Sequence, residues 1–246
     1  MAPIGRRLAA SRGVLEPIQT KRSIAGQIAE LYSVVKDLAE APVHLIGHSW
    51  GAWLSILFAV EYPEAVKKLI LVGSGPLEER FVDEFRARLD GNLSLSDREE
   101  LRSVRARLPE AKGKEKQRLF KRLGELSDKG YDFDRDPNGL QAEDELPPNA
   151  EINELVWREA KVLRSGGELL RCLSRLKCPV FAIHGDYDPH PAEGIREPME
   201  RLVKEFRFVI IDKCGHTPWL ERQAADVFYS VLEDALEDES VEKAEE

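Results

Sequence analysis

The sequence is poor in the features that stabilise secreted proteins or hold proteins in membranes. It contains only three cysteines, Cys172, Cys178 and Cys214, an odd number without the paired spacing of a metal site. Reduced thiols are therefore expected rather than a disulfide framework. No apolar run approaches the roughly 20 residues of a membrane span, and no apolar signal segment follows Arg6 and Arg7. These absences favour a cytoplasmic protein that does not enter a membrane.

An excess of basic charge is also lacking. The net charge is -9, which argues against a nucleic-acid partner. The acidic residues concentrate near the C-terminus, where residues 232–246 contain eight of them and one lysine. A block of like charges is typical of a solvated segment, so we expect residues 237–246 to form an acidic tail.

Short apolar runs alternate with segments in which apolar residues recur at helical spacing. This order predicts an α/β fold with a mostly parallel sheet and helices on both faces. Hydrophobic residues make up 42% of the chain, which suffices for one sizeable core. Residues 1–22 show no periodicity, and we expect a loop there, followed by a helix that Ser23 caps. The expected strands are 43–47, 68–73, 179–185 and 206–211, and the expected helices begin near residues 24, 52, 195 and 223.

A different composition marks residues 76–177. They are rich in charged residues, carry leucines at helical spacing and lack strand-like runs, so we expect a helical insertion. The expected organisation is a core of residues 1–75 and 178–236 with a cap of residues 76–177. Four acidic residues in the cap, Asp132, Asp134, Asp136 and Glu143, occupy positions 1, 3, 5 and 12 of a calcium-loop pattern. The sixth position requires glycine but is Pro137, so we expect an acidic loop without calcium.

The most informative stretch is the G-x-S-x-G motif at residues 47–51, which lies between an expected strand and an expected helix. That context is typical of a nucleophile elbow, a sharp turn that holds a serine in a strained conformation. Gly47 and Gly51 are expected to allow a close backbone approach on either side of Ser49. The backbone N–H of Trp50, at the helix start, is a candidate oxyanion donor.

Two further polar groups follow later strands. Asp186 and Asp188 come after the third expected strand, and His216 comes after the fourth. Open parallel sheets bind ligands at the carboxyl ends of their strands, so these side chains are expected near Ser49. A serine, then an acid, then a histidine is the chain order of hydrolases that use a serine nucleophile. Both acids remain candidates on spacing alone.

The motifs G-H-S-W-G, H-G-D-Y-D-P and G-H-T-P-W-L-E together resemble the α/β-hydrolase superfamily, most closely its capped esterase, lipase and prolyl-iminopeptidase-like members. The resemblance covers about residues 23–75 and 176–235. It implies Ser49 as nucleophile, His216 as general base and then acid, and Asp188 rather than Asp186 as the residue that orients His216. It also implies cleavage of a small ester or amide through an acyl-enzyme, without a metal or organic cofactor.

Other residues near these motifs carry weaker expectations. His48 adjoins Ser49 but is expected to point away from it in a structural role. His44 and His184 fall within strands and are expected to pack there, whereas His190 is expected at the rim of the site. The Trp50 side chain either lines the pocket or packs against the cap.

The chain departs from the family pattern at its beginning. Only 22 residues precede the first expected helix, and no His-Gly or Gly-Gly segment precedes the elbow to supply a second oxyanion donor. The strand at 43–47 is thus expected to form an exposed, apolar sheet edge, which invites pairing or aggregation. Three explanations remain open: a start upstream of Met1, missing strands supplied by a second copy or another polypeptide, or a non-catalytic relative. The alternative function is a binding or assembly subunit, and a homo-oligomer that covers the edge is one expected partner arrangement.

Overall fold

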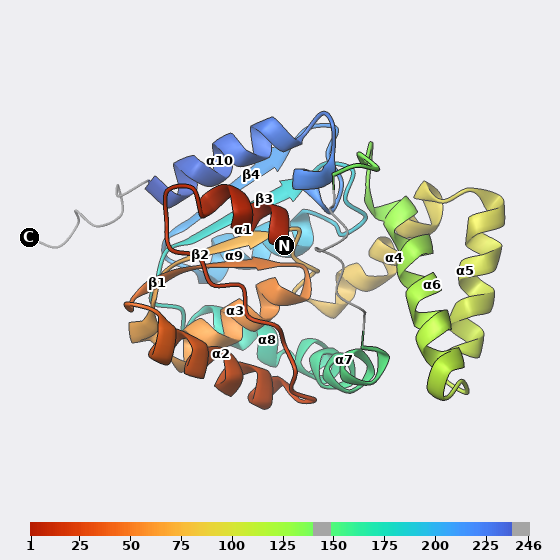
Figure 1. The fold of residues 1–246 in the computed structure, drawn as a ribbon, viewed down its shortest axis with the longest axis horizontal. Helices are drawn as coiled ribbons and strands as arrows, with labels where there is room; N and C mark the ends of the chain where they lie inside the picture. The colour runs from red at the N-terminus through yellow and green to blue at the C-terminus, as the bar shows by residue number, and fades with distance from the viewer. Residues whose placement is uncertain (140–148, 238–246) are drawn as a thin grey trace, which may run out of the picture.

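The computed structural model describes residues 1–139 and 149–237, and its centre is a four-stranded sheet (Figure 1). The strands lie in the order β1-β2-β3-β4, and all three pairings are parallel. Each expected strand is present within two residues of its predicted limits, so the α/β prediction is confirmed. The strands are β1 (Val43–His48), β2 (Val66–Val72), β3 (Val180–Gly185) and β4 (Phe206–Ile211).

Helices cover both faces of the sheet, because alternate side chains of a strand point to opposite sides. Leu69 and Leu71 of β2 are buried in one hydrophobic core, and Ile70 and Val72 are buried in another on the opposite face. The helices on the first face are α2 (Ile24–Leu38), α3 (Trp50–Glu61), α8 (Glu168–Leu173) and α9 (Glu193–Leu202). Those on the second are α1 (Ala2–Leu8) and α10 (Ala225–Glu237).

Helix α1 corrects the expectation of a loop over residues 1–22. Its two core-facing residues, Ile4 and Leu8, stand one turn apart and are 1% and 6% exposed. They pack in the core that α10 also covers. Seven residues are too few for a convincing period, so tertiary packing decides this helix. The predicted cap of α2 is confirmed, since Ser23 Oγ accepts a hydrogen bond from Gly26 N at 3.1 Å.

Strand β1 is an edge of the described sheet. Among the described residues it pairs only with β2, and beside it lies a cavity of about 1000 Å³. Helix α2 and parts of the segment 12–19 also line this cavity, so the edge is half-buried rather than open to solvent.

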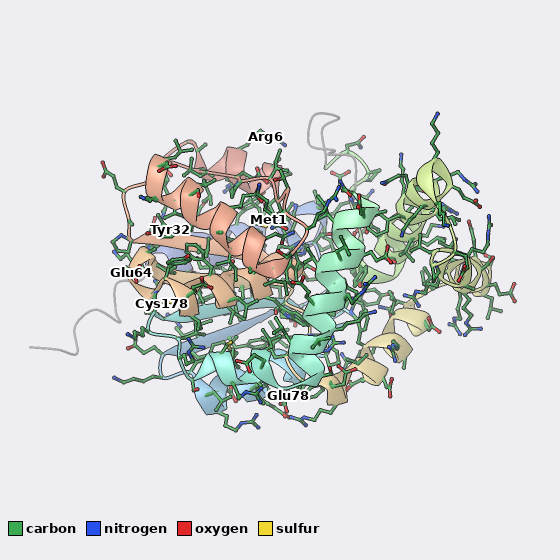
Figure 2. All side chains as sticks on the ribbon, turned by 90° about the horizontal axis from the view of Figure 1, so that it is seen from below. Met1, Arg6, Tyr32, Glu64, Glu78 and Cys178 are labelled. Atoms are coloured by element: carbon green, nitrogen blue, oxygen red, sulfur yellow. The ribbon has the colours of Figure 1, made fainter. Side chains whose placement is uncertain are left out.

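The helices between β2 and β3 divide into two groups. Leu101 of α5 (Leu95–Arg107) and Leu126 of α6 (Gly113–Tyr131) belong to a separate small core. Leu93, which directly follows α4 (Val82–Asn92), belongs to the same core. In contrast, Val156 of α7 (Ala150–Ser165) and Leu169 of α8 belong to the main core. Figure 2 shows α2 and α7 on the near side of the sheet, with α4 to α6 at one end. The labelled residues Glu64 and Cys178, which precede β2 and β3, lie at the other end.

The acidic residues of the calcium-like pattern have protein partners. Asp132 accepts hydrogen bonds from the Thr217 hydroxyl and from Arg135, and Asp134 pairs with Arg222 at 2.5 Å. Glu143 and residues 238–246 of the expected tail lie outside the described residues. The described residues also include the short 3-10 turns η1 (Pro63–Ala65), η2 (Glu79–Phe81) and η4 (Pro218–Leu220).

The cysteines and the helices agree with two expectations from composition. All three cysteine thiols are free, and burial raises the pKa of Cys178 to about 11. Within residues 1–139 and 149–237, no helix is long and apolar enough to cross a membrane.

Candidate active site

Ser49 occupies a strained turn between the end of β1 and the start of α3. Its φ of 54° and ψ of -117° lie outside the regions that a non-glycine residue usually adopts. The Ser49 backbone N–H donates to Val72 O at 3.1 Å, which ties the turn to the end of β2. Such strain persists only where the surroundings impose it, and it concentrates at functional sites.

The two glycines of the motif differ in what they allow. A Cβ on Gly47 would lie 2.4 Å from Gly51 O and 2.6 Å from Ser55 Oγ, so no side chain fits there. A Cβ on Gly51 would meet nothing within 4 Å. The expectation that both glycines serve a close approach is therefore wrong for Gly51, because its position opens into the cavity beside β1.

Asp188 and His216 meet at the carboxyl ends of β3 and β4. The Nδ1 atom of His216 lies 2.7 Å from Asp188 Oδ2, and the two residues are 6% and 1% exposed. Asp186 instead accepts a hydrogen bond from Cys214 N at 3.0 Å, which joins the two loops. The structure thus places Asp188, and not Asp186, against His216.

Gly73 brings this pair next to the serine turn. It follows β2 with a φ of 51°, and a Cβ on it would lie 3.0 Å from His216 Nδ1 and 3.3 Å from Asp188 Oδ2. Its neighbour Val72 accepts the hydrogen bond of Ser49 N. The sequence analysis missed Gly73, although a glycine directly after a buried strand was a visible signal for a close approach.

The charges in this group are strongly perturbed. Burial acts to lower the pKa of His216, but the Asp188 carboxylate outweighs it and holds that pKa above its usual 6.5. Burial acts to raise the pKa of Asp188, but His216 and His190 beside it hold that pKa well below 3.8. Asp188 is therefore an anion at neutral pH, and an anion accepts the Nδ1–H of His216.

His48 contacts the histidine loop, which is the segment after β4 that carries His216. Its Nε2 atom lies 2.9 Å from the backbone oxygen of His216, and the two rings are 4.5 Å apart. Burial lowers the pKa of His48 well below 6.5, so its ring is neutral and Nε2 donates to that oxygen. His44 lies in β1 as expected, and His184 lies buried in β3 with Nε2 2.8 Å from His190 O.

His190 is buried at the centre of the site, which corrects its expected place at the rim. It is 8% exposed, and its Nδ1 atom lies 2.8 Å from Asp188 Oδ1. Its ring stacks on Phe85 of α4 at a centroid distance of 4.5 Å and lies 5.4 Å from Tyr131 of α6. The proline on each side of His190 suggested only a loop, so the sequence carried no signal for this contact.

A second buried carboxylate holds the histidine loop. Glu221 is 1% exposed and accepts three backbone N–H groups, from Gly215 at 2.6 Å, Asp134 at 3.1 Å and Phe133 at 3.2 Å. His216 N also donates to Tyr131 O at 2.9 Å. The segment after α6 is thereby fastened to the loop that carries His216.

The cavity along β1 reaches the serine turn. Ser49, Trp50 and His48 line one end of it, and its remaining walls are largely apolar. The Trp50 indole N–H donates to Gln27 Oε1 at 3.1 Å. The Trp50 ring also lies edge-on to Trp53, with 6.3 Å between the ring centroids, so Trp50 both lines this cavity and packs against the main core.

In the part of the chain that the structure describes, one cluster offers metal-ligand atoms. Asp188, His190 and His216 present ligand atoms within 4.8 Å of one another. Both Nδ1 atoms already lie 2.7–2.8 Å from the Asp188 oxygens, whereas a zinc ion binds nitrogen at about 2.0–2.1 Å. An ion at these atoms would replace the hydrogen bonds between the acid and the histidines.

Comparison with known proteins matches the chain to a family by sequence, and a solved structure shares its fold. The family model described as "Alpha/beta hydrolase family" matches residues 15–229. The chain is 24% identical over 226 residues to AB hydrolase superfamily protein YclE of Bacillus subtilis (strain 168), covering 87% of this chain and 77% of that protein. It is 24% identical over 215 residues to a proline iminopeptidase of Heyndrickxia coagulans, covering 85% and 72%. The crystal structure of VinJ superimposes with a TM-score of 0.62 at 19% identity, covering 88% of this chain and 73% of that one.

Proposed function

The chain belongs to the alpha/beta hydrolase family, and we propose that it is a serine hydrolase that cleaves a small ester or amide through an acyl-enzyme. One observation carries this proposal: the strained Ser49 turn adjoins a buried Asp188–His216 pair through Val72 and Gly73. A proline iminopeptidase among its relatives agrees with amide or ester chemistry.

In the proposed acylation step, Asp188 fixes the proton of His216 on Nδ1, so Nε2 carries a lone pair. His216 Nε2 takes the hydroxyl proton of Ser49 as the serine oxygen bonds to the substrate carbonyl carbon. The C–O or C–N bond of the leaving group then breaks, and His216 returns the proton to that group. The acyl group remains on Ser49.

Deacylation uses the same residues with water as the nucleophile. His216 accepts a proton from water, the water oxygen bonds to the acyl carbon, and Ser49 leaves with the proton from His216. The backbone N–H of Trp50, at the first residue of α3, is the proposed donor to the oxyanion in both steps. Each step uses protein groups and water alone.

The helices of residues 76–177 have a proposed role as a cap that shapes access to the site. Phe85 of α4 stacks on His190, and the ring of Tyr131 of α6 lies 4.7 Å from that of His216. Substrate selection by this cap would act directly beside the reacting groups. We also propose a cytoplasmic location, since free cysteines are typical of a reducing compartment.

A binding or assembly subunit is the second candidate function. The cavity of about 1000 Å³ beside β1 favours it, because an unpaired strand edge binds extended chains. A second copy of the chain would cover the edge in a homo-oligomer. This role does not require turnover at Ser49.

The two candidates are separated by turnover on a substrate panel. The full chain would be assayed on p-nitrophenyl acetate, p-nitrophenyl butyrate and prolyl p-nitroanilide, with Ser49→Ala as the matched control. Hydrolysis by the parent that Ser49→Ala loses supports the enzyme. A folded parent that gives the same rate as Ser49→Ala on all three substrates favours the subunit.

A further inference from the structure

The Asp188 carboxylate binds two histidine rings, one through each oxygen. Oδ2 lies 2.7 Å from His216 Nδ1, and Oδ1 lies 2.8 Å from His190 Nδ1. The backbone N–H of His190 also donates to Oδ1 at 2.9 Å. The terminal torsion of an aspartate is soft, so donors on Oδ1 determine where Oδ2 points.

The contact with His190 orients the carboxylate without neutralising it. Burial outweighs the attraction of Asp188 and holds the pKa of His190 below 6.5, so this ring is neutral at pH 7. Its one ring proton lies on Nδ1, because the ionised carboxylate can only accept. His216 therefore still faces a full negative charge, which it needs when it takes a proton.

The His190 ring is itself held from outside the sheet. The ring of Phe85 lies parallel to it, with an interplanar angle of 1° at 4.5 Å, and Tyr131 lies at 5.4 Å on a plane tilted by 26°. These aromatic residues belong to α4 and α6, and His190 follows β3. Helices α4 and α6 thus contact a ring that is hydrogen-bonded to the acid of the site.

We propose that His190 is a positioning residue that turns the Asp188 carboxylate toward His216. The inference rests on the proposed function, since it concerns the alignment of the same site. It assigns a role to a buried side chain that the acyl-transfer steps do not use.

Two substitutions separate the hydrogen bond of His190 from its packing. His190→Asn keeps an N–H donor near the position of Nδ1 but removes the stacked ring. His190→Phe keeps a ring in contact with Phe85 and Tyr131 but removes the donor. The measurement is the second-order rate constant for phosphonylation of Ser49 by a fluorophosphonate, with circular dichroism to verify that each variant is folded.

We expect His190→Phe to react about tenfold more slowly than the parent. This loss is at the low end for a buried hydrogen bond to a charged group, because the backbone N–H of residue 190 still donates to Asp188. His190→Asn should stay within about threefold of the parent rate, because it retains a side-chain donor. The reverse order, or parent-like rates in both variants, overturns the proposal. Both proteins would also be treated with EDTA. If EDTA changes the rate of the parent but not that of His190→Phe, His190 is a metal ligand, and the positioning proposal is overturned.

A second readout keeps this test separate from that of the proposed function. The proton on His216 Nδ1, hydrogen-bonded to Asp188, is expected as a far-downfield NMR resonance in the parent and in His190→Asn. It should be lost or broadened in His190→Phe. If the parent fails to react with the probe, the proposed function fails, and the resonance still decides whether His190 aligns the acid. Retention of the resonance in His190→Phe contradicts the alignment.

Discussion

Asp188 Oδ2 and His216 Nδ1 lie 2.7 Å apart, although 28 residues of sequence separate the two side chains. They meet because β3 and β4 are parallel neighbours, so the carboxyl ends of both strands lie at the same end of the sheet. Gly73, after the neighbouring β2, leaves room for both. The contact between Asp188 and His216 therefore depends on the ends of β2, β3 and β4.

Replacement of Asp188 by asparagine should lower kcat by roughly 10³- to 10⁴-fold, because an amide no longer fixes the proton of His216 on Nδ1. Asp186→Asn is the matched control, since Asp186 accepts a hydrogen bond from the backbone of Cys214, whereas Asp188 contacts His216. Steady-state kinetics on the best substrate of the panel measures both. Equal losses in the two variants would contradict the assignment of Asp188.

The pH profile should follow the raised pKa of His216. A protonated imidazole cannot accept the serine proton, so kcat/KM is expected to rise with pH through a pKa above 6.5. The same shift stabilises the fold most below pH 6.5, and that stabilisation is lost as the pH rises through the raised pKa. An acidic limb centred below pH 6.5 would be inconsistent with the Asp188 contact.

The two glycines of the serine motif should respond differently to alanine. Gly47→Ala is expected to lower the free energy of unfolding by at least about 2 kcal/mol, since its Cβ overlaps the backbone of Gly51. Gly51→Ala should leave it unchanged or raise it by up to about 1 kcal/mol, because alanine favours a helix. Urea unfolding measures both. A large loss in Gly51→Ala would show that another group packs against it.

Glu221 should matter for stability more than an acidic surface residue. The Glu221 carboxylate accepts hydrogen bonds from three backbone N–H groups. In Glu221→Gln the amide NH2 group faces some of these donors, which should lower the free energy of unfolding by about 2–3 kcal/mol. Glu200→Gln, on the exposed side of α9, is the control and should change little. Chemical denaturation compares them. Equal stabilities would mean that the loop does not depend on Glu221.

The sequence allowed the prediction of those features that local patterns encode. The strands were readable because apolar runs such as 206–211 are bounded by polar or turn residues, and the Ser49 turn was readable because it joins a strand to a helix. Helix α1 was not, because its two buried residues span one turn and depend on α10.

The missed parts of the site share a different cause. His190 and Glu221 act through loops that meet only in the folded chain, with partners such as Phe85 and Phe133 far away in sequence. Residue type alone predicted a rim for His190 and no role for Glu221. Burial and partners, which a single sequence does not show, decide both.

The most direct test of the account is the mass of the intact chain after exposure to a fluorophosphonate probe, with Ser49→Ala as control. The strained turn and the Asp188–His216 pair predict one adduct per parent chain and none on the variant. A folded parent chain that gains no adduct, or an adduct that persists in Ser49→Ala, would contradict the claim that Ser49 is an activated nucleophile.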